Sequence, residues 1–283
     1  MRCLPCLRLS VPRARPHGAN VGLLLLMVLA IGAPSLTRLR PIFAAEPEEA
    51  ALPRLLVPAY FYPAGEGLAH WDNLIAAAKQ ADITAIVNPA SGPGEKSDLN
   101  YVEVVRRADK AGVRLLGYVS TAYGKRTQAE MTADIDRWLK LYPKIDGIFL
   151  DEQASSAEQV DLYGQLYDYA RKQKKLKLVV TNPGTACAEE YVQRPAADTV
   201  CLFEGPKGFL DAKLPGWTED YTADRCLALA YDVSADDWQA HWDAAVSKRC
   251  GWVYITDASG ANPWDKLPSY WDKLVAAGRK RVK

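Results

Sequence analysis

This chain of 283 residues has few histidines and phenylalanines and almost no excess of charge of either sign. It has three His and five Phe, and 35 basic residues against 34 acidic ones leave a net charge of +1. Such a balance gives no strong electrostatic field to attract nucleic acid. The sequence also lacks a G-x-S-x-G nucleophile elbow, a P-loop and an H-E-x-x-H metal motif. We therefore expect neither a nucleic-acid partner nor the chemistry that those three motifs serve.

The first 45 residues have the composition of an export segment. Four arginines precede the apolar stretch VGLLLLMVLAIGA at residues 21–33. A basic segment followed by a short apolar run is typical of a secretory signal, and this run is shorter than the roughly 20 residues of a membrane span. We predict that residues 1–45 are a signal peptide, or an uncleaved membrane anchor, plus a tether. Residues 46–283 would then form a secreted or periplasmic, extracytoplasmic domain.

Cysteine is also sparse beyond residue 45, where no C-x-x-C motif or Cys/His cluster occurs. This spacing argues against a zinc site. Export to an oxidising compartment favours disulfides, and four cysteines allow three pairings. Cys226 and Cys250 lie at the starts of neighbouring predicted strands, so a bridge between them is a hypothesis. The four cysteines are Cys187, Cys201, Cys226 and Cys250.

A repeated pattern begins at residue 55, in which an apolar, β-branched run is followed by a polar loop and a stretch with helical spacing. The runs are nearly continuous, which is typical of strands covered on both faces. They occupy residues 55–63, 84–89, 114–120, 146–152, 177–184, 199–205, 225–233 and 251–259. The clearest helices are predicted over 68–81, over 236–248 and after Thr127, a candidate N-cap. Residues 206–224, rich in Gly and Pro, give the weakest helix pattern.

Eight strand–helix repeats predict a single (β/α)8 TIM barrel over residues 46–283. A doubly wound open sheet is the alternative, but it usually carries a Gly-rich first turn. The segment YFYPAGEG at residues 60–67 matches G-x-G-x-x-G poorly. His70 and His241 fall in helical stretches, where we expect them to face solvent.

The carboxyl ends of the predicted strands, where barrel enzymes place their active sites, carry acids, amides, hydroxyls and tyrosines. They lack His and Cys. Asp151 and Glu152 close the fourth run, and Glu204 follows an apolar stretch in the sixth, where a carboxylate is costly unless it is paired or functional. For Asp232 and Asp257 a structural role, as a helix cap or loop brace, stands equally beside a functional one.

A ring of carboxylates with aromatic neighbours suits glycoside hydrolysis, which uses one carboxylic acid and one carboxylate. Asp151 and Glu204 come from the fourth and sixth strands and can face each other across the barrel mouth. Their separation would decide between a retaining and an inverting reaction. Asp151 and Glu152 are consecutive, so in a regular strand one should point into the pocket while the other braces the rim. This chemistry needs no metal and no organic cofactor.

Six strings of the sequence together resemble the spherulin-4-like proteins, also called spherulation-specific family 4. The resemblance runs in the family's order from about Val57 to Glu204, and the final third of the chain is less diagnostic. The strings are VPAYFYP, IVNPASGPG, LLGYVSTAYGKR, DIDRWLKLYPKIDGIFLDE, VVTNPGT and LFEGP.

The resemblance implies a TIM barrel and a secreted glycoside hydrolase. The family includes fungal enzymes acting on galactosaminogalactan, and it is related to endo-α-1,4-polygalactosaminidases. By this analogy Asp151, with Glu152 beside it, is the general acid/base and Glu204 the nucleophile or charge stabiliser, although the two roles could be exchanged. The residues implied to line the sugar pocket are Tyr60, Tyr62, Asn88, Tyr118, Tyr123 and Asn182.

The resulting hypothesis is an exported, retaining and endo-acting glycoside hydrolase. It would cleave an α-linked polymer of galactosamine or N-acetylgalactosamine within an exopolysaccharide or biofilm matrix, and we expect it to be a monomer. The main rival is a barrel of the same fold that binds polysaccharide without cleaving it. A polysaccharide deacetylase or other metal enzyme is disfavoured, because no predicted strand end carries His.

Overall fold

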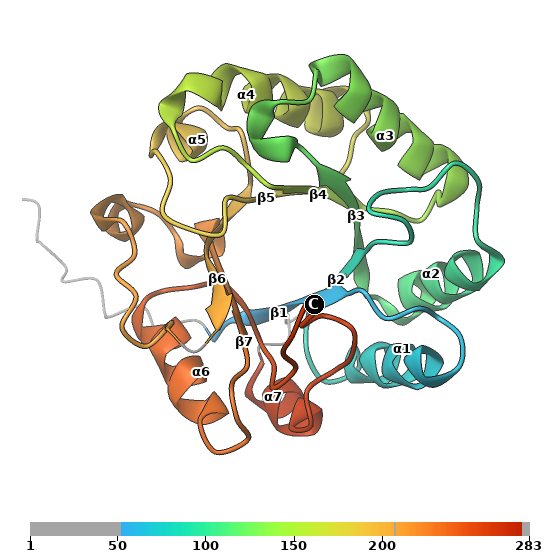
Figure 1. Cartoon of the computed structure of the whole chain (residues 1–283), viewed down its shortest axis with the longest axis vertical. Helices are drawn as coiled ribbons and strands as arrows, with labels where there is room; N and C mark the ends of the chain where they lie inside the picture. Colours follow the sequence, from blue (N-terminus) through green and yellow to red (C-terminus); the bar gives the residue numbers. More distant parts are fainter. Residues whose placement is uncertain (1–51, 207, 279–283) are drawn as a thin grey trace, which may run out of the picture. The chain divides into compact units, whose positions relative to one another are not determined.

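Eight parallel strands form a closed barrel with helices outside it, as the repeat predicted (Figure 1). The computed structural model describes residues 52–206 and 208–278. The predicted signal or anchor at 1–45 lies outside them. Each strand pairs with the next along the chain, and β1 closes on β8. The alternative of an open, doubly wound sheet is therefore wrong.

All eight predicted strands are present, most of them shorter than the apolar runs. They are β1 Arg54–Ala59, β2 Ile83–Val87, β3 Arg114–Ser120, β4 Gly147–Asp151, β5 Leu178–Asn182, β6 Thr199–Pro206, β7 Cys226–Tyr231 and β8 Trp252–Ile255. The strands are almost wholly buried, because the barrel interior lies on one face and the helices on the other. The apolar runs therefore do not alternate with polar residues.

The helices that cover the barrel are longest in its first half. They are α1 Glu66–Ala77, α2 Leu99–Ala111, α3 Gln128–Leu141, α4 Val160–Asp168, α5 Glu190–Gln193, α6 Trp238–Ser247 and α7 Trp271–Ala277. A π-helical turn, Tyr169–Gln173, continues α4. Between β6 and β7 the described residues contain only short 3-10 turns, which agrees with the weak pattern there. None of the described helices is long and apolar enough to span a bilayer.

Helix α3 shows how local sequence and packing together position a strand that carries site residues. Thr127 and Glu130 form the capping box that the sequence favours at this point. The buried Trp138 then donates from its indole nitrogen to the backbone oxygen of Tyr118 at 2.8 Å. Gly117 on β3 leaves the space for that indole, since a Cβ there would lie 2.6 Å from the ring. The contact fixes the helix against the end of β3.

Two expectations about individual side chains are wrong. The four cysteines beyond residue 45 are buried free thiols, and no bridge joins Cys226 to Cys250. Leu227 pairs with Trp252 across β7 and β8, so the same register places Cys226 beside Gly251 and not beside Cys250.

His241 is 3% exposed, because it lies on the buried face of α6 with Trp238 and Trp242. His70 is half-buried and packs on Phe61.

Candidate active site

Three polar residues end neighbouring strands in one row at the carboxyl side of the barrel. Ser120 of β3 pairs with Asp151 of β4, and Asp151 pairs with Asn182 of β5. Directly paired residues of parallel strands point to the same face of a sheet. Gly117 of β3 faces Trp138 of the outer helix α3, so by alternation Ser120 points inward. The row therefore lies on the inner side of the barrel, at its mouth.

A bulge in β6 brings Glu204 to the same inner side. Cys201 pairs with Leu227, but the next pairs are Phe203 with Ala228 and Glu204 with Leu229. Leu202 is therefore the extra residue of the bulge. Because the bulge shifts the alternation by one residue, Glu204 points to the same face as Cys201. In a regular strand Glu204 would point outward to the helix layer.

One side-chain amide joins the two carboxylates. The amide nitrogen Nδ2 of Asn182 donates to Oδ1 of Asp151 at 2.8 Å and also to Oε2 of Glu204. Each hydrogen bond spans about 3 Å, so the two acceptor oxygens lie within about 6 Å of each other. Asn182 also accepts from the backbone of Gly184 at 2.8 Å, and it is 5% exposed. The expectation that Asp151 and Glu204 face each other is met by this geometry.

Burial is the largest influence on both carboxyl groups, and it raises the pKa of each. For Asp151, hydrogen bonds from Tyr118, the backbone of Glu152 and Asn182 oppose this rise in pKa. For Glu204, the negative charge of Asp151 raises the pKa further, while hydrogen bonds from Asn182 and Trp264 lower it. The charge of Glu152 also raises the pKa of Asp151. Because the charge of Asp151 raises the pKa of Glu204, protonation of Asp151 favours ionisation of Glu204.

Two tyrosines line the pair from the side of β1 and β3. The rings of Tyr60 and Tyr118 meet edge to face, with centroids 6.0 Å apart. Burial raises the pKa of both phenols, and the charge of Asp151 adds to that effect. Both hydroxyls therefore stay protonated at neutral pH and can donate hydrogen bonds. Both residues lie where the sugar pocket was expected.

Glu152 lies beside the linked pair and bonds to a different partner. Its backbone is left-handed, with φ of 56°, directly after the last residue of β4. Its Oε2 accepts from the hydroxyl of Ser120. Arg126 donates to the backbone oxygen of Ser120 at 2.7 Å and pairs with Asp134. This arrangement resembles the rim brace that consecutive acids predict.

The other residues expected in the sugar pocket lie further out and serve the loops as well. Asn88 accepts from the backbone of Gly92 at 2.8 Å and so holds the loop after β2. Tyr62 is exposed and donates to Asp98, the N-cap of α2, at 2.9 Å. Tyr123 is 58% exposed, with φ of 56°. Tyr62 and Tyr123 are thus exposed aromatic residues that follow β1 and β3, and the ring of Tyr62 also packs on Tyr101.

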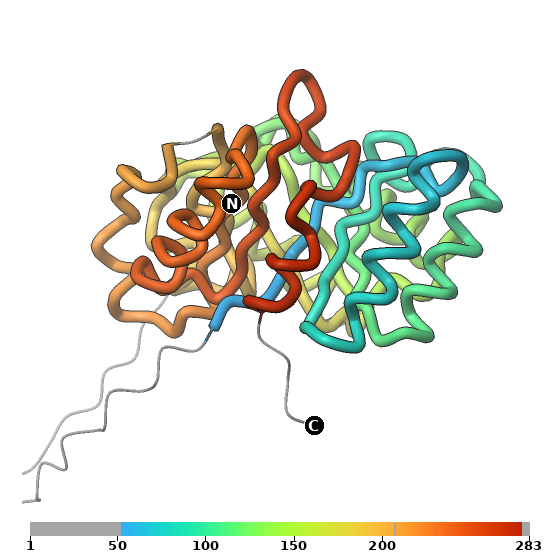
Figure 2. Tube along the Cα trace, turned by 90° about the horizontal axis from the view of Figure 1, so that it is seen from below, coloured from blue at the N-terminus to red at the C-terminus, as the bar shows by residue number. Residues whose placement is uncertain are grey.

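Trp264 belongs to the site but was not found from the sequence. It lies in the segment between β8 and α7, which rises past the edge of the barrel in the side view (Figure 2). It hydrogen-bonds Glu204 and packs on Tyr231 and Tyr254. Its backbone oxygen also accepts from the Tyr60 backbone at 3.1 Å. Strand patterns carry no information about a residue so far beyond a strand end. In the same segment Asp257 accepts from the backbone of Ser269, which is the structural role of a loop brace that was weighed for it against a functional one.

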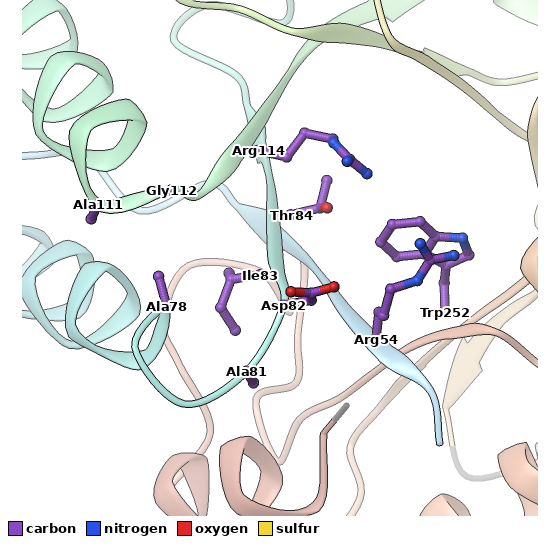
Figure 3. A pocket seen from close by; sticks show the side chains of 10 residues that line it. All are labelled: Arg54, Ala78, Ala81, Asp82, Ile83, Thr84, Ala111, Gly112, Arg114 and Trp252. Atoms are coloured by element: carbon purple, nitrogen blue, oxygen red, sulfur yellow. The ribbon is translucent and has the colours of Figure 1, made fainter. Parts of the chain in front are cut away.

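A cavity of about 550 Å³ lies at the opposite end of the barrel (Figure 3). It is lined by Arg54, Ile83, Arg114 and Trp252, which begin β1, β2, β3 and β8. The guanidinium of Arg54 stacks 3.6 Å from the Trp252 ring centroid and pairs with Asp224. Barrel enzymes react at the carboxyl ends of their strands, so this cavity is not the candidate active site. Within the described residues no group of three or more His, Cys, Asp or Glu could hold a metal ion.

The family model described as spherulation-specific family 4 matches residues 54–277, which is the whole barrel. The chain belongs to this family. The match extends beyond the strings that carried the resemblance and includes the last third of the chain. Spherulin-4 of Physarum polycephalum is 31% identical over 236 residues, covering 79% of this chain and 69% of its own. Among solved structures, Aspergillus clavatus Sph3 in complex with GalNAc matches with a TM-score of 0.68 at 25% identity. That match covers 80% of this chain and 97% of the Sph3 chain.

Proposed function

We propose that this spherulation-specific family 4 protein is a glycoside hydrolase. The observation that carries the proposal is the linked pair of half-buried carboxyl groups, Asp151 and Glu204, at the mouth of the barrel. Glycosidases need one protonated and one ionised carboxyl group on either side of the scissile bond. Mutual repulsion in a buried setting gives that division of protons. Aspergillus clavatus Sph3, whose structure the barrel resembles, was crystallised with GalNAc.

The spacing of the pair favours a retaining reaction. Retaining enzymes hold their carboxyl groups about 5–5.5 Å apart, whereas inverting enzymes leave about 6.5–9.5 Å for a water. Two oxygens that share one amide nitrogen fall in the shorter range. Asp151 as the acid would protonate the leaving oxygen while Glu204 attacks the anomeric carbon. Water would then break the resulting ester, giving its proton to Asp151 and a hydroxyl to the sugar.

The proposed substrate is an exopolysaccharide of α-linked galactosamine or N-acetylgalactosamine, cleaved within the chain. The exposed rings of Tyr62 and Tyr123 support internal cleavage, because sugar units beyond the reacting one would stack on such faces. If the same site binds sugar but does not cleave it, the barrel is a polysaccharide-binding protein. The raised pKa of both carboxyl groups favours the enzyme, since a binding acid needs no proton near the working pH.

A reducing-end assay tests the proposal. The purified chain is incubated with galactosaminogalactan, its deacetylated form and unrelated glycans, alongside Asp151→Asn, Glu204→Gln and Glu152→Gln. We expect oligosaccharide release by the wild type, with kcat lower by about 10²–10⁴ in the first two variants and a milder loss in Glu152→Gln. Binding without release from any glycan would establish the binding barrel instead. Full turnover by Glu204→Gln would refute its assigned role.

We also propose that the protein is exported and acts as a monomer. The basic residues and apolar run before residue 34 support export, and extracellular polymers would be reachable only outside the cell. Mass determination of the protein recovered from the medium, the periplasm and the membranes would separate a cleaved signal from a retained anchor. Light scattering on the same material would give the oligomeric state.

A further inference from the structure

The contacts of Asn182 are directed at the two carboxyl groups and its own loop. An amide nitrogen has two hydrogens, and in Asn182 one bonds to Asp151 and the other to Glu204. The amide oxygen accepts from the backbone of Gly184, which settles which end of the amide faces the carboxylates. With both donors in use and 5% of the residue exposed, Asn182 has little to offer a sugar directly.

We propose that Asn182 is a positioning residue that couples Asp151 and Glu204 into one acid–base unit. A single planar amide fixes the distance between the two carboxyl groups and gives each the same kind of hydrogen bond. The coupled unit can then hold one proton between its two members. This inference rests on the proposed function and replaces the expected sugar-contacting role of Asn182.

The donors that hydrogen-bond to Asp151 and Glu204, and so stabilise their ionised forms, are uncharged. The titratable groups that face it are Tyr60 of β1, Tyr118 of β3, Glu152 after β4 and Cys201 of β6. Tyr231 at the end of β7 packs on Trp264. None of these groups carries a positive charge at neutral pH. Among the ion pairs of the described residues, none includes Asp151 or Glu204.

Hydrogen bonds to an ionised carboxylate favour ionisation, whereas burial opposes it. Tyr118 hydrogen-bonds to Asp151, and Trp264 hydrogen-bonds to Glu204. Of these donors, only Asn182 hydrogen-bonds to both carboxyl groups. Its loss should therefore make both groups harder to ionise and move the titration of the whole pair to higher pH. Because the sites interact, the titration belongs to the pair and not to either residue.

The chain contains a matched control for this role. Asn88 directly follows β2, Asn182 is the last residue of β5, and each is followed by Pro. The amide oxygen of Asn88 accepts from Gly92, just as that of Asn182 accepts from Gly184. Both residues thus brace a loop, but only the Asn182 amide nitrogen bonds to carboxylates. Asn88→Ala and Asn182→Ala each remove one hydrogen bond from a loop N–H to the amide oxygen, and only Asn182→Ala also removes the link to the pair.

The experiment is a titration of the full chain by carboxyl ¹³C NMR in wild type, Asn182→Ala and Asn88→Ala. The resonances are assigned with Asp151→Asn and Glu204→Gln. We expect Asn182→Ala to move the titration of the pair upward and Asn88→Ala to leave it in place. The pH profile of glycan cleavage should shift upward on both limbs in Asn182→Ala, with kcat/KM lower by about 10²–10³. Asn182→Ser can donate to only one carboxylate, so it should give a smaller shift and replaces Asn182→Ala if that variant does not fold.

An unmoved titration in folded Asn182→Ala or Asn182→Ser, or an equal shift in Asn88→Ala, would overturn the coupling. A wild type that cleaves no glycan would defeat the proposed function but not this inference, because NMR measures the coupling without turnover. The two failures are therefore distinguishable.

Discussion

The carboxyl group of Glu204 lowers the stability of the folded barrel while serving the proposed reaction. It is held in a buried setting beside another acid, and this setting raises its pKa. Its ionised form is therefore less stable in the folded barrel than in the unfolded chain. The fold bears this cost at neutral pH, as proteins commonly do at functional sites.

Glu204→Gln should accordingly raise the melting temperature at neutral pH. Because the folded-state pKa lies above the unfolded one, the cost is fully present above the raised pKa and disappears as the pH falls from there to the unfolded-state pKa. The gain over wild type should therefore shrink toward acid pH. Thermal unfolding across a pH series measures it. Glu103→Gln is the control, since Glu103 is exposed and bonded to Arg106, and that variant should show no such gain. A gain that does not depend on pH would contradict the argument.

At the scale of one element, β4 connects core packing to the site. The strand begins at Gly147 and ends at Asp151, so a displacement at its start is carried to the carboxylate. A Cβ on Gly147 would lie 2.2 Å from the backbone oxygen of Leu178 and 2.7 Å from the side chain of Leu116. The first of these atoms is backbone on the next strand and cannot move aside alone.

Gly147→Ala should therefore destabilise the barrel by about 1–3 kcal/mol, the usual cost of overpacking. Glycan cleavage per folded molecule should fall as well, since Asp151 moves with the strand. Urea unfolding gives the first quantity and an active-site-normalised assay the second. Gly216→Ala is the control, because a Cβ there meets nothing within 4 Å. Equal stability of the two variants would show that β4 can absorb the shift.

At the scale of the whole molecule, the closure of the barrel depends on a short seam. Strands β1 and β8 pair through only two residue pairs, Arg54 with Trp252 and Leu55 with Val253. Arg54 strengthens the seam from inside the barrel. Its guanidinium stacks on the ring of Trp252 and pairs with Asp224. The seam lies at the amino ends of the strands, far along β1 from the carboxylates.

Arg54→Ala should lower stability by about 1–3 kcal/mol through loss of a charge-assisted contact and a cation–π stack. In a barrel of this size each kcal/mol corresponds to about 2–4 °C in Tm. The pH profile of cleavage should not change, because the stack and ion pair lie at the opposite end. Calorimetry and the cleavage assay test the two parts. A shifted pH profile would mean that closure controls the site.

The amino-acid sequence by itself determined the fold class, the order of the strands and the family. Eight apolar runs, separated by stretches with helical spacing, are enough to predict the barrel, because a strand that is buried on both faces leaves a continuous apolar run in the sequence. It also placed Asp151 at the end of its strand and Glu204 near the end of its own. Only the tertiary structure decided that Glu204 points inward, since the bulge at Leu202 arises from pairing with β7 and leaves no mark in a continuous apolar run. The contacts of Asn182 and Trp264 and the free state of Cys226 and Cys250 were likewise settled by register and loop packing. These depend on residues distant in sequence, whereas periodicity describes only neighbours along the chain.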